Sequence, residues 1–243
     1  MKNYSQTLDA IVPDRPGQTN PPNIVPVGIV QLETGFSKES SKTAEIITTN
    51  FLYNTSLLRI GLLENCEVRL LIEYAGTKID SPAHSSTING FNPISIGTKL
   101  AVCPERGIIP QTSLNVSVAL PYFGSQEFRP AYLAPSFIFL MQNTLSDRYS
   151  LGYNLGLQWD GNQPNATAVY SISLSINVLE NFGVFAEAYG FSMEKSLSDY
   201  RGDFGCTYLV TNNLQLDISG GVGLNSIAPD SFIAFGFAWR IGK

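Results

Sequence analysis

The 243-residue sequence lacks the features that identify helical membrane proteins, nucleic-acid-binding proteins and most soluble domains. No run approaches the roughly 18 consecutive apolar residues that indicate a membrane-spanning helix. Charged residues make up only 14% of the chain, whereas soluble domains average about 25%. The net charge is −5 and no basic cluster is present, which argues against nucleic acid as a partner. If the chain enters a bilayer, it must do so as a closed β-barrel, the other fold that satisfies its backbone hydrogen bonds in lipid.

Residues that carry catalysis or bind metals are also scarce. The single histidine, His84, lies in the segment DSPAHSST, but no flanking pattern supplies the oriented base that a hydrolase requires. We interpret it as a solvated loop residue and expect no enzyme activity. Cys66, Cys103 and Cys206 lack the CxxC spacing of metal and redox sites, and whether any two of them pair stays open. The sequence therefore predicts no catalytic residue, no metal site and no cofactor.

The stretch 149–178 shows the clearest positive pattern. In YSLGYNLGLQWD every odd position from Tyr149 to Trp159 is apolar and every even position is small or polar, and TAVYSISLSINV repeats this. Because side chains alternate across a strand, each arm has one apolar and one polar face. A soluble sandwich would show the same alternation with its apolar face inward. Arms of about ten residues with aromatic ends favour a transmembrane barrel, with the apolar face towards lipid.

The alternation recurs over 27–243 and predicts a single antiparallel up-and-down transmembrane β-barrel of about twelve strands. In the second strand, about 45–62, it places Leu52 outward and Tyr53 inward. Short turns with Asn at the tip, such as LLENCEV and VLENFGV, alternate with longer connections, such as the expected loop 79–92. Short turns at one rim and long loops at the other are typical of outer-membrane barrels, with the turns in the periplasm.

Residues 1–26 are polar and rich in proline, which excludes ladder strands and regular helix. We expect them to form either a periplasmic tail or a plug that enters the lumen, and the sequence does not decide between the two. The start, MKNYSQTLDA, has no apolar stretch typical of a signal peptide. Because an outer-membrane protein requires one, we expect this numbering to begin after its cleavage site; a soluble protein is the alternative explanation.

Ten ionisable residues lie on the face of the predicted strands that points into the barrel. They are Glu33, Arg59, Glu67, Arg69, Glu73, Lys99, Glu187, Asp203, Asp217 and Arg240. An inward phase is expected in any barrel, because Arg or Lys facing lipid at mid-bilayer costs about 2–4 kcal/mol. These residues are interpreted either as a paired network that fills the lumen or as a polar pathway that selects a solute. Twelve strands enclose a lumen of intermediate width, so size does not decide.

Four blocks of the sequence resemble a known family: DRPGQTNPPNIVPVGIVQLETGF (14–36), NTSLLRIGLLENCEVRL (54–70), QNTLSDRYSLGYNLGLQWDG (142–161) and DISGGVGLN with APDSFIAFGFAWRI (217–241). They resemble the outer-membrane β-barrel family labelled "MetA-pathway of phenol degradation", whose members are often described as transporters. The resemblance implies a location in the outer membrane of a Gram-negative bacterium. One departure is the C-terminal sequence WRIGK, because many such barrels end on an aromatic residue that is recognised during assembly.

Two functional hypotheses follow. The first is a channel or transporter for a small solute, with a hydrophobic solute as one candidate. The alternative is a non-conducting barrel that serves as a structural or accessory subunit of an outer-membrane protein complex. In both hypotheses the barrel is surrounded by outer-membrane lipid, and the sequence names neither the solute nor a protein partner.

Overall fold

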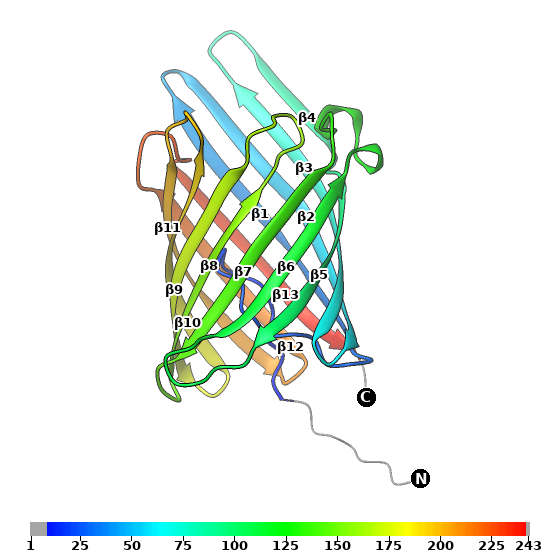
Figure 1. The fold of residues 1–243 in the computed structure, drawn as a ribbon. Coiled ribbons are helices and arrows are strands. Elements are labelled where there is room, and N and C mark those ends of the chain that lie inside the picture. The colour runs from blue at the N-terminus through cyan, green and yellow to red at the C-terminus, as the bar shows by residue number, and fades with distance from the viewer. Residues whose placement is uncertain (1–8, 242–243) are drawn as a thin grey trace.

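The computed structural model describes residues 9–241, and within them the chain forms one closed antiparallel β-barrel (Figure 1). The strands are β1 (Val30–Thr43), β2 (Ile46–Leu63), β3 (Cys66–Asp80), β4 (Ser85–Phe91), β5 (Ile94–Cys103), β6 (Gln111–Leu120), β7 (Ala134–Thr144), β8 (Tyr149–Gln158), β9 (Thr167–Leu179), β10 (Phe182–Met193), β11 (Asp199–Thr211), β12 (Leu214–Gly223) and β13 (Ser231–Ile241). Two short 3-10 turns, η1 (Pro121–Phe123) and η2 (Gln126–Phe128), lie between β6 and β7. No helix in the described range is long and apolar enough to cross a membrane.

The barrel wall is twelve strands in circumference, as the sequence predicts. The thirteen labelled strands make twelve positions because β4 and β5 share one: β3 pairs with β5 over 66–71 and with β4 over 74–80. Asn92 and Pro93 interrupt the strand between β4 and β5, because proline has no N–H group to donate to the ladder of hydrogen bonds. The barrel closes where β1 pairs with both β2 and β13. The expected loop 79–92 is therefore wrong, since most of it is strand.

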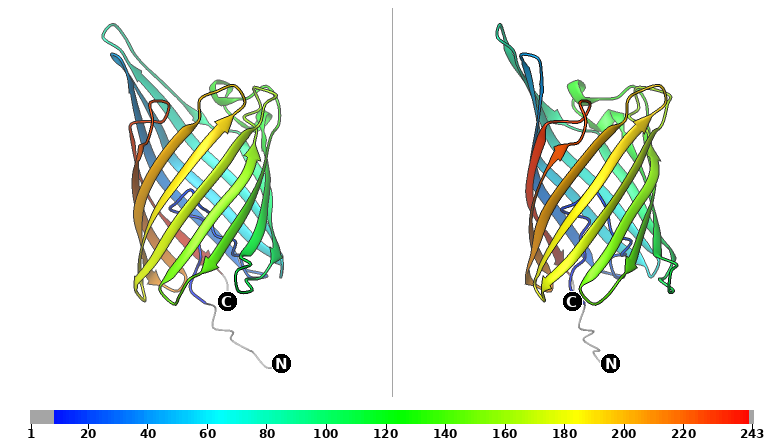
Figure 2. Two further views of the ribbon diagram at one scale, coloured as in Figure 1. Left: turned by 60° about the vertical axis from the view of Figure 1, so that its left-hand side comes forward. Right: turned by 90° about the vertical axis from the view of Figure 1, so that its left-hand side faces the viewer.

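The two rims of the barrel differ in how far the chain extends beyond them. The β2–β3, β9–β10 and β11–β12 turns lie at the lower rim, together with both ends of the described chain (Figures 1 and 2). The β1–β2 and β3–β4 hairpins project beyond the upper rim (Figure 2). Short turns are periplasmic in outer-membrane barrels, so the lower rim faces the periplasm and the hairpins face outward from the cell.

The outer surface of the barrel is apolar because one face of each strand carries the large hydrophobic residues. Leu155 on β8 is 57% exposed and Ile218 on β12 is 46% exposed, as befits side chains that contact lipid. An aromatic band crosses the outside of five neighbouring strands, with ring centroids 5.1 to 6.5 Å apart. It consists of Phe235, Phe36, Phe51, Tyr53, Tyr74 and Phe91. Such bands mark the membrane–water interface, so the hairpins above it lie outside the hydrocarbon region.

One strand departs from the predicted alternation. The pairing of β2 with β3 shifts between Leu52 and Asn54, which inserts an extra residue into β2. Tyr53 consequently lies on the outer face, stacked on Phe51 with ring centroids 5.3 Å apart, while Leu52 lines the lumen. The expectation of Leu52 outward and Tyr53 inward is wrong, because a bulge changes the phase without changing the composition of the strand.

Candidate functional site

The lumen holds residues 9–29, which precede β1 and are called the lumen segment from here on. The segment enters at the periplasmic rim, where the Ile11 amide donates to the carbonyl of Asn212 at 2.8 Å. It rises into the barrel, turns back and leaves at the same rim, where the Gly28 amide donates to the Gly61 carbonyl at 2.9 Å. Figures 1 and 2 show this loop in blue inside the barrel. Residues 1–8 of the expected segment 1–26 lie outside the described residues.

The wall holds the backbone of the lumen segment through three carboxylates. A segment without regular structure must find other partners for its buried amides, and hydrogen bonds to carboxylates are strong ones. The bonds run to Glu33 from Asp14 and Arg15 (2.9 and 3.1 Å), to Glu187 from Gln18 and Thr19 (2.5 and 2.9 Å), and to Glu67 from Val25 (2.8 Å). Each of these carboxylates therefore binds the main chain of the lumen segment, and these bonds do not depend on which side chains the segment carries.

Asp14 lies at the centre of a buried charge cluster. Its carboxylate is 3.1 Å from Arg59 on β2, 2.5 Å from Arg69 on β3 and 2.7 Å from Lys99 on β5. Arg59 also contacts Glu33 at 2.9 Å and Glu67 at 2.8 Å. The wall supplies three cations and two carboxylates to this cluster, so Asp14 brings the charge that balances it. A buried ion network is stable only when every charge has a partner.

The descending half of the lumen segment is held through its carbonyl groups. Lys99 donates to the carbonyl of Pro21 at 2.9 Å, and the Ser113 hydroxyl donates to that of Pro22 at 2.6 Å. Arg59 donates to the carbonyl of Asn23 at 2.8 Å. The wall thus presents acceptors to the amides and donors to the carbonyls of a chain whose prolines exclude regular hydrogen bonding.

Arg15 occupies a space that two glycines leave in the wall. Its guanidinium group bonds Asp217 on β12 at 2.9 Å. Gly35 on β1 and Gly236 on β13 face each other in the sheet register, and a Cβ atom at Gly35 would lie 2.5 Å from Cζ of Arg15. Glycine at position 35 therefore leaves room for the guanidinium group of Arg15 against the wall, and close approach of another group is one of the reasons for glycine inside a strand.

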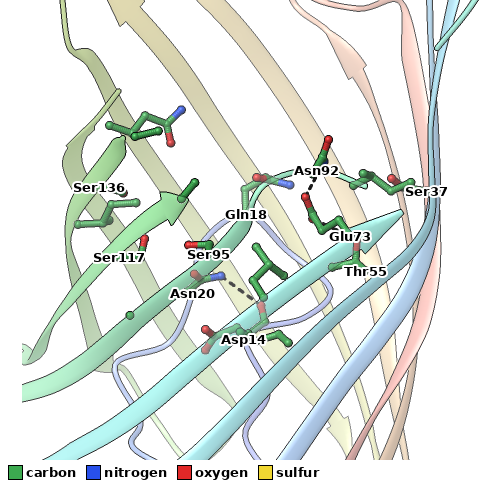
Figure 3. A pocket seen from close by; sticks show the side chains of 18 of the residues that line it. Asp14, Gln18, Asn20, Ser37, Thr55, Glu73, Asn92, Ser95, Ser117 and Ser136 are labelled. Atoms are coloured by element: carbon green, nitrogen blue, oxygen red, sulfur yellow. Dashed lines mark hydrogen bonds between the residues drawn. The ribbon is translucent and has the colours of Figure 1, made fainter. Parts of the chain in front are cut away.

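The lumen segment separates two cavities. The upper cavity, of about 790 Å³, opens towards the extracellular loops, and the lower one, of about 320 Å³, lies towards the periplasmic turns. Residues 14–17 and Asn20 line both. Figure 3 shows Asp14, Gln18 and Asn20 of the segment beside the wall of the upper cavity. Any molecule that crosses the barrel must pass this part of the chain.

Charged groups around the upper cavity already have hydrogen-bond partners within the protein. Glu73 accepts hydrogen bonds from Thr55 at 3.3 Å and from Asn92 at 2.9 Å, and Arg201 bonds Glu39 at 2.7 Å. The remaining polar lining consists mainly of neutral hydroxyl and amide groups. They include Ser95, Asn115, Ser117, Ser136 and Gln158. The cavity therefore offers neutral hydrogen-bonding groups, whereas its charges are engaged in holding the wall and the segment.

The ten ionisable residues expected inside all lie on the lumen side, but in different settings. Five of them surround Asp14 and its neighbours: Glu33, Arg59, Glu67, Arg69 and Lys99. Glu187 and Asp217 contact the lumen segment, and Asp203 lies beside Glu187. Glu73 lines the upper cavity. Arg240 bonds the carbonyl of Asp9 and the side chain of Asn213 at the periplasmic rim. Sequence reasoning missed Asp14 and Arg15, although both open the DRPG block.

The remaining candidates have no part in this arrangement. His84 lies in the exposed turn between β3 and β4, where its backbone bonds Ser81. Within the described residues Cys66, Cys103 and Cys206 form no disulfide. The same part of the chain contains no group of three or more His, Cys, Asp and Glu residues that could hold a metal ion.

The sequence profile of the family described as "MetA-pathway of phenol degradation" matches residues 13–241. The chain belongs to this family. Among solved structures, an outer membrane channel from Pseudomonas putida F1 has a TM-score of 0.68 at 10% identity, over 93% of this chain and 99% of that one. The KdgM porin in complex with disordered oligogalacturonate has a TM-score of 0.56 at 7% identity, over 88% and 99%. For the CymD monoaromatic hydrocarbon channel the TM-score is 0.51 at 9% identity, over 90% and 89%.

At these identities the likeness establishes the fold, an outer-membrane β-barrel. Together with the apolar outer face and the aromatic band, it places the protein in the bacterial outer membrane. No curated protein matches the chain.

Proposed function

We propose that the protein is an outer-membrane channel for a small solute and that the lumen segment closes it. The observation that carries this proposal is the position of residues 14–20 between two cavities of one lumen. Only non-covalent bonds hold the described part of the segment there, so the obstruction is removable in principle. The similar solved structures include two channels and a porin, which supports conduction as the role of the fold.

The chemistry of the upper cavity favours a polar solute over a purely hydrophobic one. Its unpaired lining groups are hydroxyls and amides, such as Ser95, Ser117 and Ser136, which gain hydrogen bonds only from a solute that has polar atoms. A cavity of about 790 Å³ accommodates a molecule in the usual size range of small ligands. Charge contributes less than hydrogen bonding to this preference, because the ionisable groups of the lining are already bonded within the protein, either to each other, as in the pair of Arg201 and Glu39, or to neutral donors, as at Glu73.

The decisive experiment is single-channel conductance in planar bilayers, with the full chain compared to a chain that lacks residues 1–26. We expect brief or rare openings from the full chain and long, discrete openings from the shortened one, because the shortened barrel has lost the barrier between its cavities. Both proteins must first be shown to be folded by their heat-dependent mobility on gels. Silence from two folded barrels would overturn the proposal.

The charge cluster around Asp14 favours a second candidate function, a permanently closed barrel that acts as a structural or accessory subunit. Buried ion networks such as that of Arg59 and Lys99 are strongly destabilised when one member is removed, which suits a fixed filling. This candidate requires protein partners that copurify with the intact chain. Conductance of the intact chain would exclude it.

A further inference from the structure

A pair of acidic residues lies next to the point where β10 holds the lumen segment. Glu187 on β10 and Asp203 on β11 are directly opposite in the sheet register, and each residue is only 6% exposed. Directly opposed residues on one face have Cβ atoms about 4.5–5.5 Å apart, so the two carboxyl groups are in reach of each other. Glu187 also accepts the amides of Gln18 and Thr19, whereas neither oxygen of Asp203 has a hydrogen-bond partner among the described residues.

The cations nearest to this pair are engaged elsewhere. Arg201, on the same strand as Asp203, bonds Asp199 at 2.6 Å and Glu39 at 2.7 Å. Arg15 of the lumen segment bonds Asp217 on β12 at 2.9 Å. The structure therefore provides no side-chain cation for the second carboxylate of the pair within residues 9–241.

The other side chains that face the pair are neutral. Tyr189 lies two residues further along β10, Ser171 and Ser173 face the pair from β9, and Ser219 comes from β12. The Ser219 hydroxyl is itself buried without a partner in the described structure, and it lies diagonal to Asp203 on the lumen face. The pair is thus surrounded by hydroxyl groups, which can form hydrogen bonds but carry no positive charge that would neutralise it.

Two buried carboxylates in contact cannot both be ionised without a compensating positive charge, because like charges repel strongly where water is excluded. We propose that Glu187 and Asp203 form a binding site for one small hard cation, a proton or a metal ion of the sodium or calcium type. Oxygen ligands from two carboxylates and a hydroxyl are the kind that such cations prefer. The site bridges β10 and β11 on the lumen face.

The occupancy of this site controls how firmly the wall holds the lumen segment; this step rests on the proposed function. With the cation bound, Glu187 remains an undisturbed acceptor for Gln18 and Thr19. When the cation leaves, the repulsion from Asp203 pushes the Glu187 carboxylate away from these amides. A Cβ atom at Gly17 would lie 3.0 Å from Oε1 of Glu187, so the segment is packed directly against the group that moves.

The test is the open probability of the full chain in planar bilayers, measured from about pH 5 to about pH 9, around the range in which proteins are generally most stable, and, at fixed pH, with added Na⁺ or Ca²⁺. If the cation is a proton, opening increases with pH by at most about tenfold per pH unit, the limit for release of one proton. If it is a metal ion, opening at fixed pH falls as that salt is raised, beyond the effect of an equal ionic strength of choline chloride.

Asp203→Asn removes one carboxylate and supplies an amide that can donate to Glu187. This variant should stay closed and should respond neither to pH nor to Na⁺ or Ca²⁺. Asp147→Asn makes the same change of charge in an exposed periplasmic turn and should respond as the wild type does. A second measurement, the unfolding temperature of the detergent-solubilised full chain, should show the same pH or cation dependence and lose it in Asp203→Asn.

Three results separate the two proposals. Silence from the folded chain lacking residues 1–26 would overturn the proposed channel, while the unfolding temperature would still report on the cation site. Conduction by that chain, together with openings and unfolding temperatures of the full chain that ignore pH, Na⁺ and Ca²⁺, would overturn the cation site alone. Equal responses in wild type and Asp203→Asn would also overturn it.

Discussion

The carboxylate of Asp14 lies 3.1 Å from the guanidinium group of Arg59, and both side chains are buried although one belongs to the lumen segment and the other to the barrel wall. Without Asp14, the wall cluster around Arg59 would hold more cations than carboxylates. The charges of the wall are therefore arranged around a charge that another part of the chain supplies. The lumen segment and the wall form one electrostatic unit, and the following predictions test its parts.

The first prediction concerns the charge of Asp14. Asp14→Asn leaves Arg69 and Lys99 without the carboxylate that both contact, and breaking a buried ion pair costs about 3–5 kcal/mol. We expect the free energy that holds the lumen segment in the barrel to fall by a large part of this amount. The open probability in bilayers should therefore increase strongly. Asp147→Asn carries the same change of charge in an exposed turn and should behave as wild type.

The second prediction concerns the space beside Arg15. Gly35→Ala places a methyl group 2.5 Å from Cζ of Arg15, and the three nearest atoms that it meets all belong to that side chain. The guanidinium group must move, so we expect weaker bonding to Asp217 and more frequent channel opening with little change in barrel folding. Gly202→Ala is the matched control, because its methyl group would meet nothing closer than 3.6 Å. Equal opening of both variants would contradict the packing role of Gly35.

The third prediction concerns a disulfide that would fix the lumen segment to the barrel wall. The hydroxyl groups of Thr19 and Ser171 are 2.9 Å apart, so cysteines at both positions are close enough to form a disulfide. In a background where Cys66, Cys103 and Cys206 are serine, the oxidised double variant should be silent in bilayers and a reductant should restore wild-type opening. Openings that persist in fully oxidised protein would show that solutes pass without displacement of the segment.

The fourth prediction concerns the two faces of β8. Leu155→Arg turns a charge towards lipid, at a cost of about 2–4 kcal/mol if the site lies at mid-bilayer. Ser150→Arg turns the same side chain into the lower cavity, where water can solvate it. We expect folding into vesicles, followed by heat-dependent gel mobility, to be impaired far more by Leu155→Arg. Equal impairment would contradict the assignment of the faces.

The sequence predicts the barrel well because lipid imposes one rule on every strand. Leu155 and Ile218 can be assigned to the outer face from their neighbours alone, since a period of two is the only pattern that separates lipid from lumen. The same rule assigns Leu52 and Tyr53 to the wrong faces, because a bulge is a property of strand pairing and cannot be recognised from the composition of β2.

The centre of the site is harder to predict for a different reason. Wall residues such as Lys99 reveal their inward phase through alternation, but nothing in a strand pattern identifies a partner outside the strands. Asp14 lies in a proline-rich stretch whose composition says only that it is irregular, so tail and plug are equally consistent with it. The three-to-two ratio of cations to carboxylates around Arg59 becomes visible only once the register of β1, β2, β3 and β5 is known.

The lumen segment enters at Ile11 and leaves at Gly28 through the same periplasmic mouth. A chain arranged in this way can be drawn out as a bend, and no free end has to thread through the barrel. Withdrawal runs along the barrel axis towards the periplasm, so an agent that draws the segment out must pull on its periplasmic ends, from inside the cell envelope. In the proposed channel, opening by withdrawal of the segment would then be driven from the periplasmic side.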